Sequence, residues 1–222
     1  MVSQHSSPTS PETYHGQFGD FTITQGDRLG VIAYRGCLLL AALSFAAGVA
    51  LILTAPDPQS VLPFLTVAYW GFTLALGGSL LLIHIYLIPL HRLLQLFWLV
   101  GSVSALVLSV RNAQPLLLTI YQMPLSIIGI GFTFAALTGI FFKEAFCFGR
   151  LETMGLTLIV PTLLLGHLFG FMPLSAEKGL LIAWAGLMVI FASRKVFQAI
   201  PSDIGDKSVF AYLKQKQAIA QQ

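Results

Sequence analysis

Residues 139–152 read Gly-Ile-Phe-Phe-Lys-Glu-Ala-Phe-Cys-Phe-Gly-Arg-Leu-Glu and hold the densest group of charges in the long apolar middle of the chain. Apolar runs long enough to be helices flank this stretch on both sides. A short charged stretch between two such runs is typical of a connection between membrane-spanning helices. We therefore expect apolar helices that cross a bilayer to set the fold, with this charged segment, residues 143–152, on one side of the membrane.

The composition supports a membrane protein. Of the 222 residues, 56% are apolar and only 9% are charged, whereas about 25% of a soluble domain is charged. The two cysteines, Cys37 and Cys147, form neither a disulfide framework nor the paired spacing of a zinc site. The basic residues gather at the ends of apolar runs, where they set orientation, so we expect neither a metal site nor a nucleic-acid partner.

Six apolar runs follow one another, each near the ~20 residues that a helix needs to cross the hydrocarbon core. We place them at residues 31–54, 61–87, 93–110, 116–142, 154–171 and 179–197. The connections between them are short, so consecutive helices are expected to be antiparallel neighbours. The predicted fold class is all-α, a multi-pass transmembrane bundle of six helices that occupies residues 16–200.

The distribution of Lys and Arg predicts the orientation. With six spans, ten of these cations fall on the side that holds both termini, and two, Arg111 and Lys178, fall on the other side. The ten are Arg28, Arg35, Arg92, Lys143, Arg150, Arg194, Lys195, Lys207, Lys214 and Lys216. By the positive-inside rule, the N and C termini are cytoplasmic, or stromal in a plastid.

The segments outside the spans are predicted separately. Residues 1–15 are polar and rich in Pro and Ser, which predicts a disordered tail. Thr24 followed by Asp27 resembles a helix N-cap, so the first helix is expected to begin there. Residues 201–222 form a C-terminal cytoplasmic tail, for which an interfacial helix on anionic headgroups and a frayed polar segment are both open.

No catalytic signature is found, and no Asp or Glu falls in the middle of a predicted span. We therefore expect no enzyme activity, and proton- or sodium-coupled transport is disfavoured. His84 and His167 are the histidines inside predicted spans, in opposite leaflets. Each alone could bind haem or a pigment, but a neutral histidine bonded to a backbone carbonyl is the simpler interpretation, so no cofactor is expected.

Charges on the terminus-bearing side form the predicted interaction surface. Arg35 lies early in the first predicted span and is costly there unless it is paired or reaches the headgroups. Glu144 is expected at the same membrane face, and we hypothesise an Arg35–Glu144 ion pair that ties the first span to the charged segment. The whole predicted surface consists of Arg28, Arg35, Lys143, Glu144, Cys147, Arg150 and Glu152.

Several motifs together resemble a known family. These are residues 16–24 (Gly-Gln-Phe-Gly-Asp-Phe-Thr-Ile-Thr), the pairs 27–28 (Asp-Arg) and 34–35 (Tyr-Arg), and residues 143–148 and 150–152 of the charged segment. The chain resembles, over about residues 14–200, an uncharacterised integral membrane family of cyanobacteria and plastids, a domain of unknown function. The resemblance implies a multi-pass protein of the plasma or thylakoid membrane, and it supplies no activity, ligand or catalytic residue.

Three functional hypotheses follow. The leading one is a non-enzymatic scaffold or assembly partner that docks to another membrane protein complex through the charged face. A second is a transporter or channel for a small solute, which would use the fourth and fifth spans, interrupted by Pro124 and Pro161. A third is a haem or pigment binder through His84 or His167.

Overall fold

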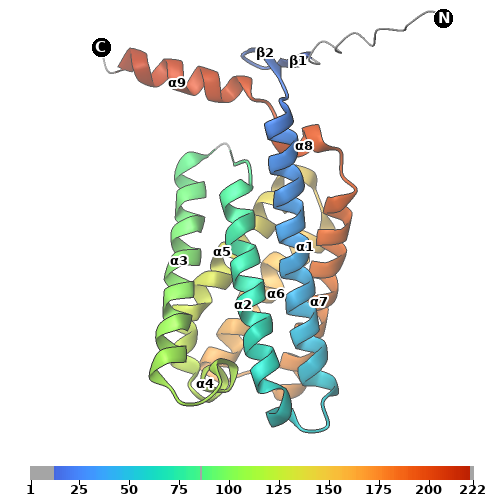
Figure 1. The fold of residues 1–222 in the computed structure, drawn as a ribbon, viewed down its shortest axis with the longest axis vertical. Coiled ribbons are helices and arrows are strands. Elements are labelled where there is room, and N and C mark those ends of the chain that lie inside the picture. The colour runs from blue at the N-terminus through green and yellow to red at the C-terminus, as the bar shows by residue number, and fades with distance from the viewer. Residues whose placement is uncertain (1–12, 86, 221–222) are drawn as a thin grey trace, which may run out of the picture.

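The computed structural model describes residues 13–85 and 87–220, and over these residues the chain forms an all-α bundle (Figure 1). Six helices or helical segments are long and apolar enough to cross a membrane. They are α1 (Gln25–Thr54), α2 (Pro58–Leu82), α3 (Ile88–Arg111), α5 (Ile127–Phe148) with the preceding 3₁₀ turn η1 (Pro124–Ser126), α6 (Leu151–Phe169) and α7 (Leu174–Val196). The predicted class and the predicted number of spans are confirmed.

Local signals in the sequence explain where several helices begin and end. At the start of α1, the Thr24 side chain accepts the Asp27 N–H at 3.2 Å, and the Asp27 carboxylate accepts the Thr24 N–H at 2.7 Å. This capping box satisfies two N–H groups that the first helical turn leaves free, and it confirms the predicted start. Helices α5 and α6 end at Gly149 and Gly170, whose φ angles of +60° and +66° suit glycine.

The fourth predicted span, residues 116–142, is wrong in its bounds. Residues Leu116–Gln122 form a separate short helix, α4, and the spanning helix continues to Phe148. The break lies at Met123, before Pro124, because a proline disfavours helical geometry in the residue before it and removes a backbone donor. This shift brings Lys143 and Glu144 into the last turns of α5.

Aromatic side chains join four of the spanning helices at the centre of the core. The Trp184 ring of α7 lies 4.4 Å from Phe45 of α1 and 5.3 Å from Phe134 of α5, between ring centroids. Phe72 of α2 stacks on Phe134 at 5.6 Å. These rings pack together within one hydrophobic cluster that also contains the fully buried α5 face, so α5 is central to the bundle.

The two ends of the bundle differ. Strands β1 (Thr13–Gly16) and β2 (Gly19–Thr22) form an antiparallel hairpin at one end, together with α8 (Ile200–Ile204) and α9 (Ser208–Ala220), while α4 lies at the other end (Figure 1). We call these the terminal end and the far end. Of the predicted tail, residues 1–12 lie outside the described residues, and residues 13–15 belong to β1.

Close backbone packing of α3 against α5 is directly testable. A Cβ atom at Gly101 would collide with the backbone of Thr133, whereas a Cβ at the lipid-facing Gly186 meets nothing within 4 Å. We expect Gly101→Ala to destabilise the bundle by about 1–3 kcal/mol through overpacking. Gly186→Ala should stabilise it by up to about 1 kcal/mol through helix propensity. Unfolding in detergent, monitored by circular dichroism, measures both, and equal midpoints for the two variants would contradict this packing.

Candidate functional site

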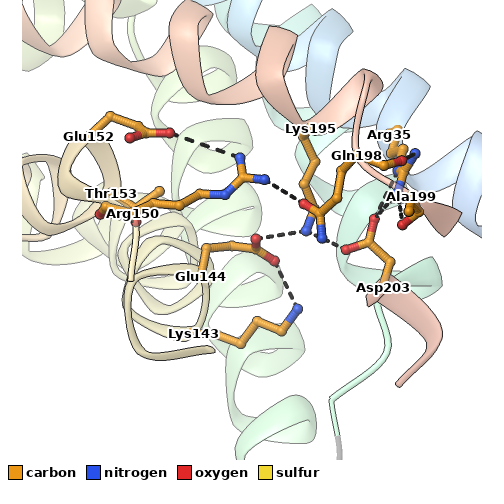
Figure 2. A network of polar contacts seen from close by, with 10 residues as sticks. All are labelled: Arg35, Lys143, Glu144, Arg150, Glu152, Thr153, Lys195, Gln198, Ala199 and Asp203. Atoms are coloured by element: carbon orange, nitrogen blue, oxygen red, sulfur yellow. Dashed lines mark hydrogen bonds and ion pairs between the residues drawn. The ribbon is translucent and has the colours of Figure 1, made fainter. Parts of the chain in front are cut away.

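A buried lysine lies between two carboxylates at the terminal end (Figure 2). The Lys195 amine of α7 donates to Glu144 Oε2 of α5 at 2.7 Å and pairs with Asp203 Oδ1 of α8. The side chains of Lys195 and Glu144 have no exposed surface. Lys143 donates to the other oxygen of Glu144 at 2.8 Å, so both oxygens of this carboxylate are bonded to cations.

Arg35 ties α1 to the same group. Its guanidinium bonds Asp203 Oδ2 through two nitrogens, at 2.8 and 2.7 Å. It also donates to the backbone carbonyls of Val196, Gln198 and Ala199, at 3.4, 2.5 and 3.1 Å. Val196 is the last residue of α7, and Gln198 and Ala199 lie in the turn between α7 and α8. The Arg35 side chain therefore holds this turn by its backbone carbonyls and also neutralises Asp203.

A second set of contacts links α6 to α7. Arg194 Nη1 donates to both oxygens of Glu152 at 2.8 Å, and Arg150 Nη2 donates to the Gln198 side chain at 2.5 Å. The Phe148 ring lies beside three cationic groups, at 4.5 Å from Lys195, 5.4 Å from Lys143 and 5.7 Å from Arg150. Cations are attracted to the faces of aromatic rings at such distances.

We call these nine residues the ionic cluster: Arg35, Lys143, Glu144, Arg150, Glu152, Arg194, Lys195, Gln198 and Asp203. Its charged members alternate in sign, with five cations and three carboxylates. Charges removed from water are tolerated only when paired and hydrogen-bonded. The cluster joins α1, α5, α6, α7 and α8. Its ion pairs and hydrogen bonds therefore hold the ends of these helices in fixed positions relative to one another.

The predicted direct ion pair between Arg35 and Glu144 is wrong. Asp203 binds Arg35, and Lys195 lies between Asp203 and Glu144. The two predicted partners belong to one cluster but do not touch, because Asp203 of α8 and Lys195 of α7 lie between them.

The predicted interaction surface divides by burial. Arg35, Glu144 and Glu152 are buried, and the side chains of Lys143 and Arg150 are only 14% and 10% exposed. Arg28 is half-buried and Cys147 is exposed. The buried members bind other parts of the same chain, so most of the predicted surface is turned inward.

Four members of the ionic cluster are not predicted from the sequence: Arg194, Lys195, Gln198 and Asp203. Two of them could have been found from the predicted topology. Six spans place Lys195 and Asp203 on the same side as Glu144, and a lysine at the end of a span is stabilised by nearby carboxylates. Gln198 carried no such signal, because its role depends on where the chain turns after α7.

The two histidines lie at opposite ends of the bundle. Helix α2 ends at Leu82, so His84 lies after the helix, where burial lowers its pKa below the usual 6.5 and favours the neutral form. His167 Nδ1 bonds Glu177 Oε1 at 2.8 Å, and its ring lies 5.1 Å from the Tyr121 ring. Its Nε2 is buried without a hydrogen-bond partner. The partner of His167 is a carboxylate and not the expected backbone carbonyl. Haem or pigment binding by either histidine stays a hypothesis.

The hairpin is bound to the segment that leads into α9. The Gln17 N–H donates to Asp206 Oδ2 at 2.6 Å, and the Phe18 N–H donates to Ser208 Oγ at 3.0 Å. The Phe18 ring stacks on Tyr212 with centroids 4.1 Å apart. We call residues 13–22 together with 205–220 the hairpin–α9 unit. A further bond, from Lys207 to Asp27 at 2.7 Å, connects this unit to the start of α1.

Comparison with known families matches residues 78–212, more than half of the chain, to the family described as "Uncharacterized integral membrane protein (DUF2301)". The chain belongs to this family of integral membrane proteins. The match includes most of the ionic cluster, while Arg35 and the hairpin precede it. No curated protein and no solved structure matches the chain.

Because Glu144 touches Lys195 but not Arg35, substitutions at Glu144 and Lys195 should interact in their effect on stability more strongly than substitutions at Glu144 and Arg35. Glu144→Gln leaves Lys195 with one carboxylate and should destabilise the protein by about 3–5 kcal/mol. Adding Lys195→Met removes the charge that has lost its partner. The double variant should therefore lose about 1–3 kcal/mol less unfolding free energy than the two single variants lose together. The measurement is a double-mutant cycle from unfolding in detergent. A cycle of Glu144→Gln with Arg35→Met is the control, and a larger coupling there would contradict the observed pairing.

The contact between the hairpin and Asp206 predicts a pH dependence. The Ser208 hydroxyl and the Gln17 N–H donate to the Asp206 carboxylate and lower its pKa below the usual 3.8. A lowered pKa stabilises the docked state above the unfolded-state value, and this stability is lost as the pH falls through the folded-state value. The hairpin should therefore stay docked at neutral pH and release below pH 3.8.

Hydrogen exchange of residues 13–22, corrected for the intrinsic rate, measures this release. Asp206→Asn should raise exchange roughly tenfold at neutral pH, because the charged acceptor is lost. Gly16→Ala should do the same, since its Cβ would collide with Asp206 and Ser208. Thr13→Ala, at an exposed strand position, is the control and should leave exchange unchanged.

Proposed function

We propose that the protein is a non-enzymatic membrane scaffold, an assembly partner that docks to another membrane complex through its terminal end. The observation that carries this proposal is the ordered connection between the ionic cluster and the hairpin–α9 unit. Four helices, α1, α5, α7 and α8, meet at buried ion pairs, and the hairpin is held by hydrogen bonds and a ring stack. A surface outside the spans that is fixed in this way can bind a partner without a large ordering cost.

The exposed part of the hairpin is the proposed contact. His15 Nδ1 and Asp20 Oδ1 lie 2.7 Å apart, and their side chains are 86% and 62% exposed. Cys147 is exposed at the end of α5, on the same end of the molecule. A partner with complementary polar and charged groups would fit this face.

The orientation and the membrane are part of the same proposal. The excess of Lys and Arg at the terminal end supports a cytoplasmic or stromal location for both termini. The resemblance of the chain to a family of cyanobacteria and plastids supports a plasma or thylakoid membrane.

The test uses exposed residues, because substitutions in the buried cluster would change the fold as well as the surface. Asp20→Lys reverses a charge on the hairpin and should abolish co-migration of the full-length protein with a larger complex from its native membrane. Lys178→Glu, an exposed charge reversal at the far end, is the matched control and should co-migrate as the wild type does. Native gel electrophoresis of gently solubilised membranes measures both.

Unfolding midpoints of both variants should equal that of the wild type, which separates surface effects from folding. Migration of the wild-type protein as a free monomer, or equal loss of the complex in both variants, would contradict docking through the hairpin.

A further inference from the structure

Helix α9 has a position unlike that of any spanning helix. It runs across the direction of the spans and lies above the terminal end of the bundle, level with the hairpin (Figure 1). In an integral membrane protein the headgroup layer lies at the ends of the spans. A helix in this place and direction lies where lipid headgroups are found.

One side of α9 is hollowed. Tyr212, Gln215, Lys216 and Ile219 line a hollow of about 280 Å³. Their spacing, i, i+3, i+4 and i+7, places them on one side of the helix. Ile219 is 65% exposed and Tyr212 is 40% exposed, so apolar surface is open to a ligand beside a cation and an amide.

The chemistry of this hollow matches a phospholipid. An acyl chain or glycerol backbone can pack against Ile219 and the Tyr212 ring, while a phosphate accepts hydrogen bonds from the Lys216 amine and the Gln215 amide. The charge also matches, because α9 contains Lys214 and Lys216 and no Asp or Glu. Each lysine near an anionic membrane surface adds to the attraction.

The hairpin holds α9 in this position. Phe18 stacks on Tyr212 at the first turns of α9, and Ser208 at its start accepts the Phe18 N–H. The hollow thus begins where the hairpin contact ends. We infer that α9 lies in the headgroup layer and that its hollow binds an anionic phospholipid, with the phosphate on Lys216 and the lipid's apolar part on Ile219.

The experiment uses the full chain with Cys37→Ala and Cys147→Ser, reconstituted into vesicles. A fluorescent label sensitive to polarity is attached at Ile219→Cys in the hollow or at the neighbouring exposed Ala218→Cys, about 100° away around the helix. The vesicles contain phosphatidylcholine alone or with phosphatidylglycerol. We expect phosphatidylglycerol to shift the emission at position 219 to the blue and protect it from an aqueous quencher, and to leave position 218 accessible.

Lys216→Gln tests the phosphate contact. It should raise the phosphatidylglycerol fraction needed for the half-maximal shift about fivefold, whereas Lys216→Arg should preserve it. Native mass spectrometry of the unlabelled protein is the independent measurement: the wild type should retain phosphatidylglycerol over phosphatidylcholine, and Lys216→Gln should lose this preference.

Three results would overturn the inference. In the first, positions 218 and 219 are equally accessible in every vesicle. In the second, protection at 219 is the same with and without phosphatidylglycerol. In the third, protection appears when the labelled protein is in native membranes but not in vesicles made from the lipids extracted from them, which would show that a protein covers the hollow. This last result would leave the scaffold proposal standing, so the two proposals fail separately.

Discussion

The structure depends on a lysine amine that has no contact with solvent. Lys195 is stable in that position only because Glu144 and Asp203 bind it from two sides. This requirement brings α5, α7 and α8 together at one point. Arg35 then binds the second oxygen of Asp203 and donates to the backbone carbonyls of the turn that joins α7 to α8. A chain lacking one of these charges would have to expose or strand the others.

The location of the cluster follows from the solvent that surrounds the helices. Charges at the centre of a bilayer are costly, whereas those at span ends can be paired and partly hydrated. In the middle of the bundle the helices are held instead by van der Waals packing. The rings of Phe45, Phe134 and Trp184 pack against one another, and Gly101 allows α3 to approach α5 closely. Packing therefore holds the apolar part, and ion pairs hold the terminal end.

The two proposals assign different tasks to one end of the molecule. The hairpin face carries exposed polar groups suited to a protein partner, and α9 carries an apolar hollow with a cation suited to a lipid. Both depend on the contacts between residues 13–22 and 205–212, because these contacts set the position of α9 relative to the spans. The family match of residues 78–212 reaches the start of α9, as far as Tyr212, but does not include the rest of α9 or the hairpin.

By itself the sequence determined the membrane class, the six spans, the shared side of the two chain ends and the start of α1 at Thr24, because length, hydropathy and capping are local properties. It did not determine that the apolar run at residues 116–142 is divided at Met123 into a short helix and a spanning helix. Nor did it determine that Arg35, Glu144 and Glu152 of the predicted surface are buried. Only the tertiary structure decided that Arg35 binds Asp203 and that Lys195 separates it from Glu144. Partner choice among charges on one side of a membrane depends on which helices are neighbours and where the chain turns, and no local pattern encodes either.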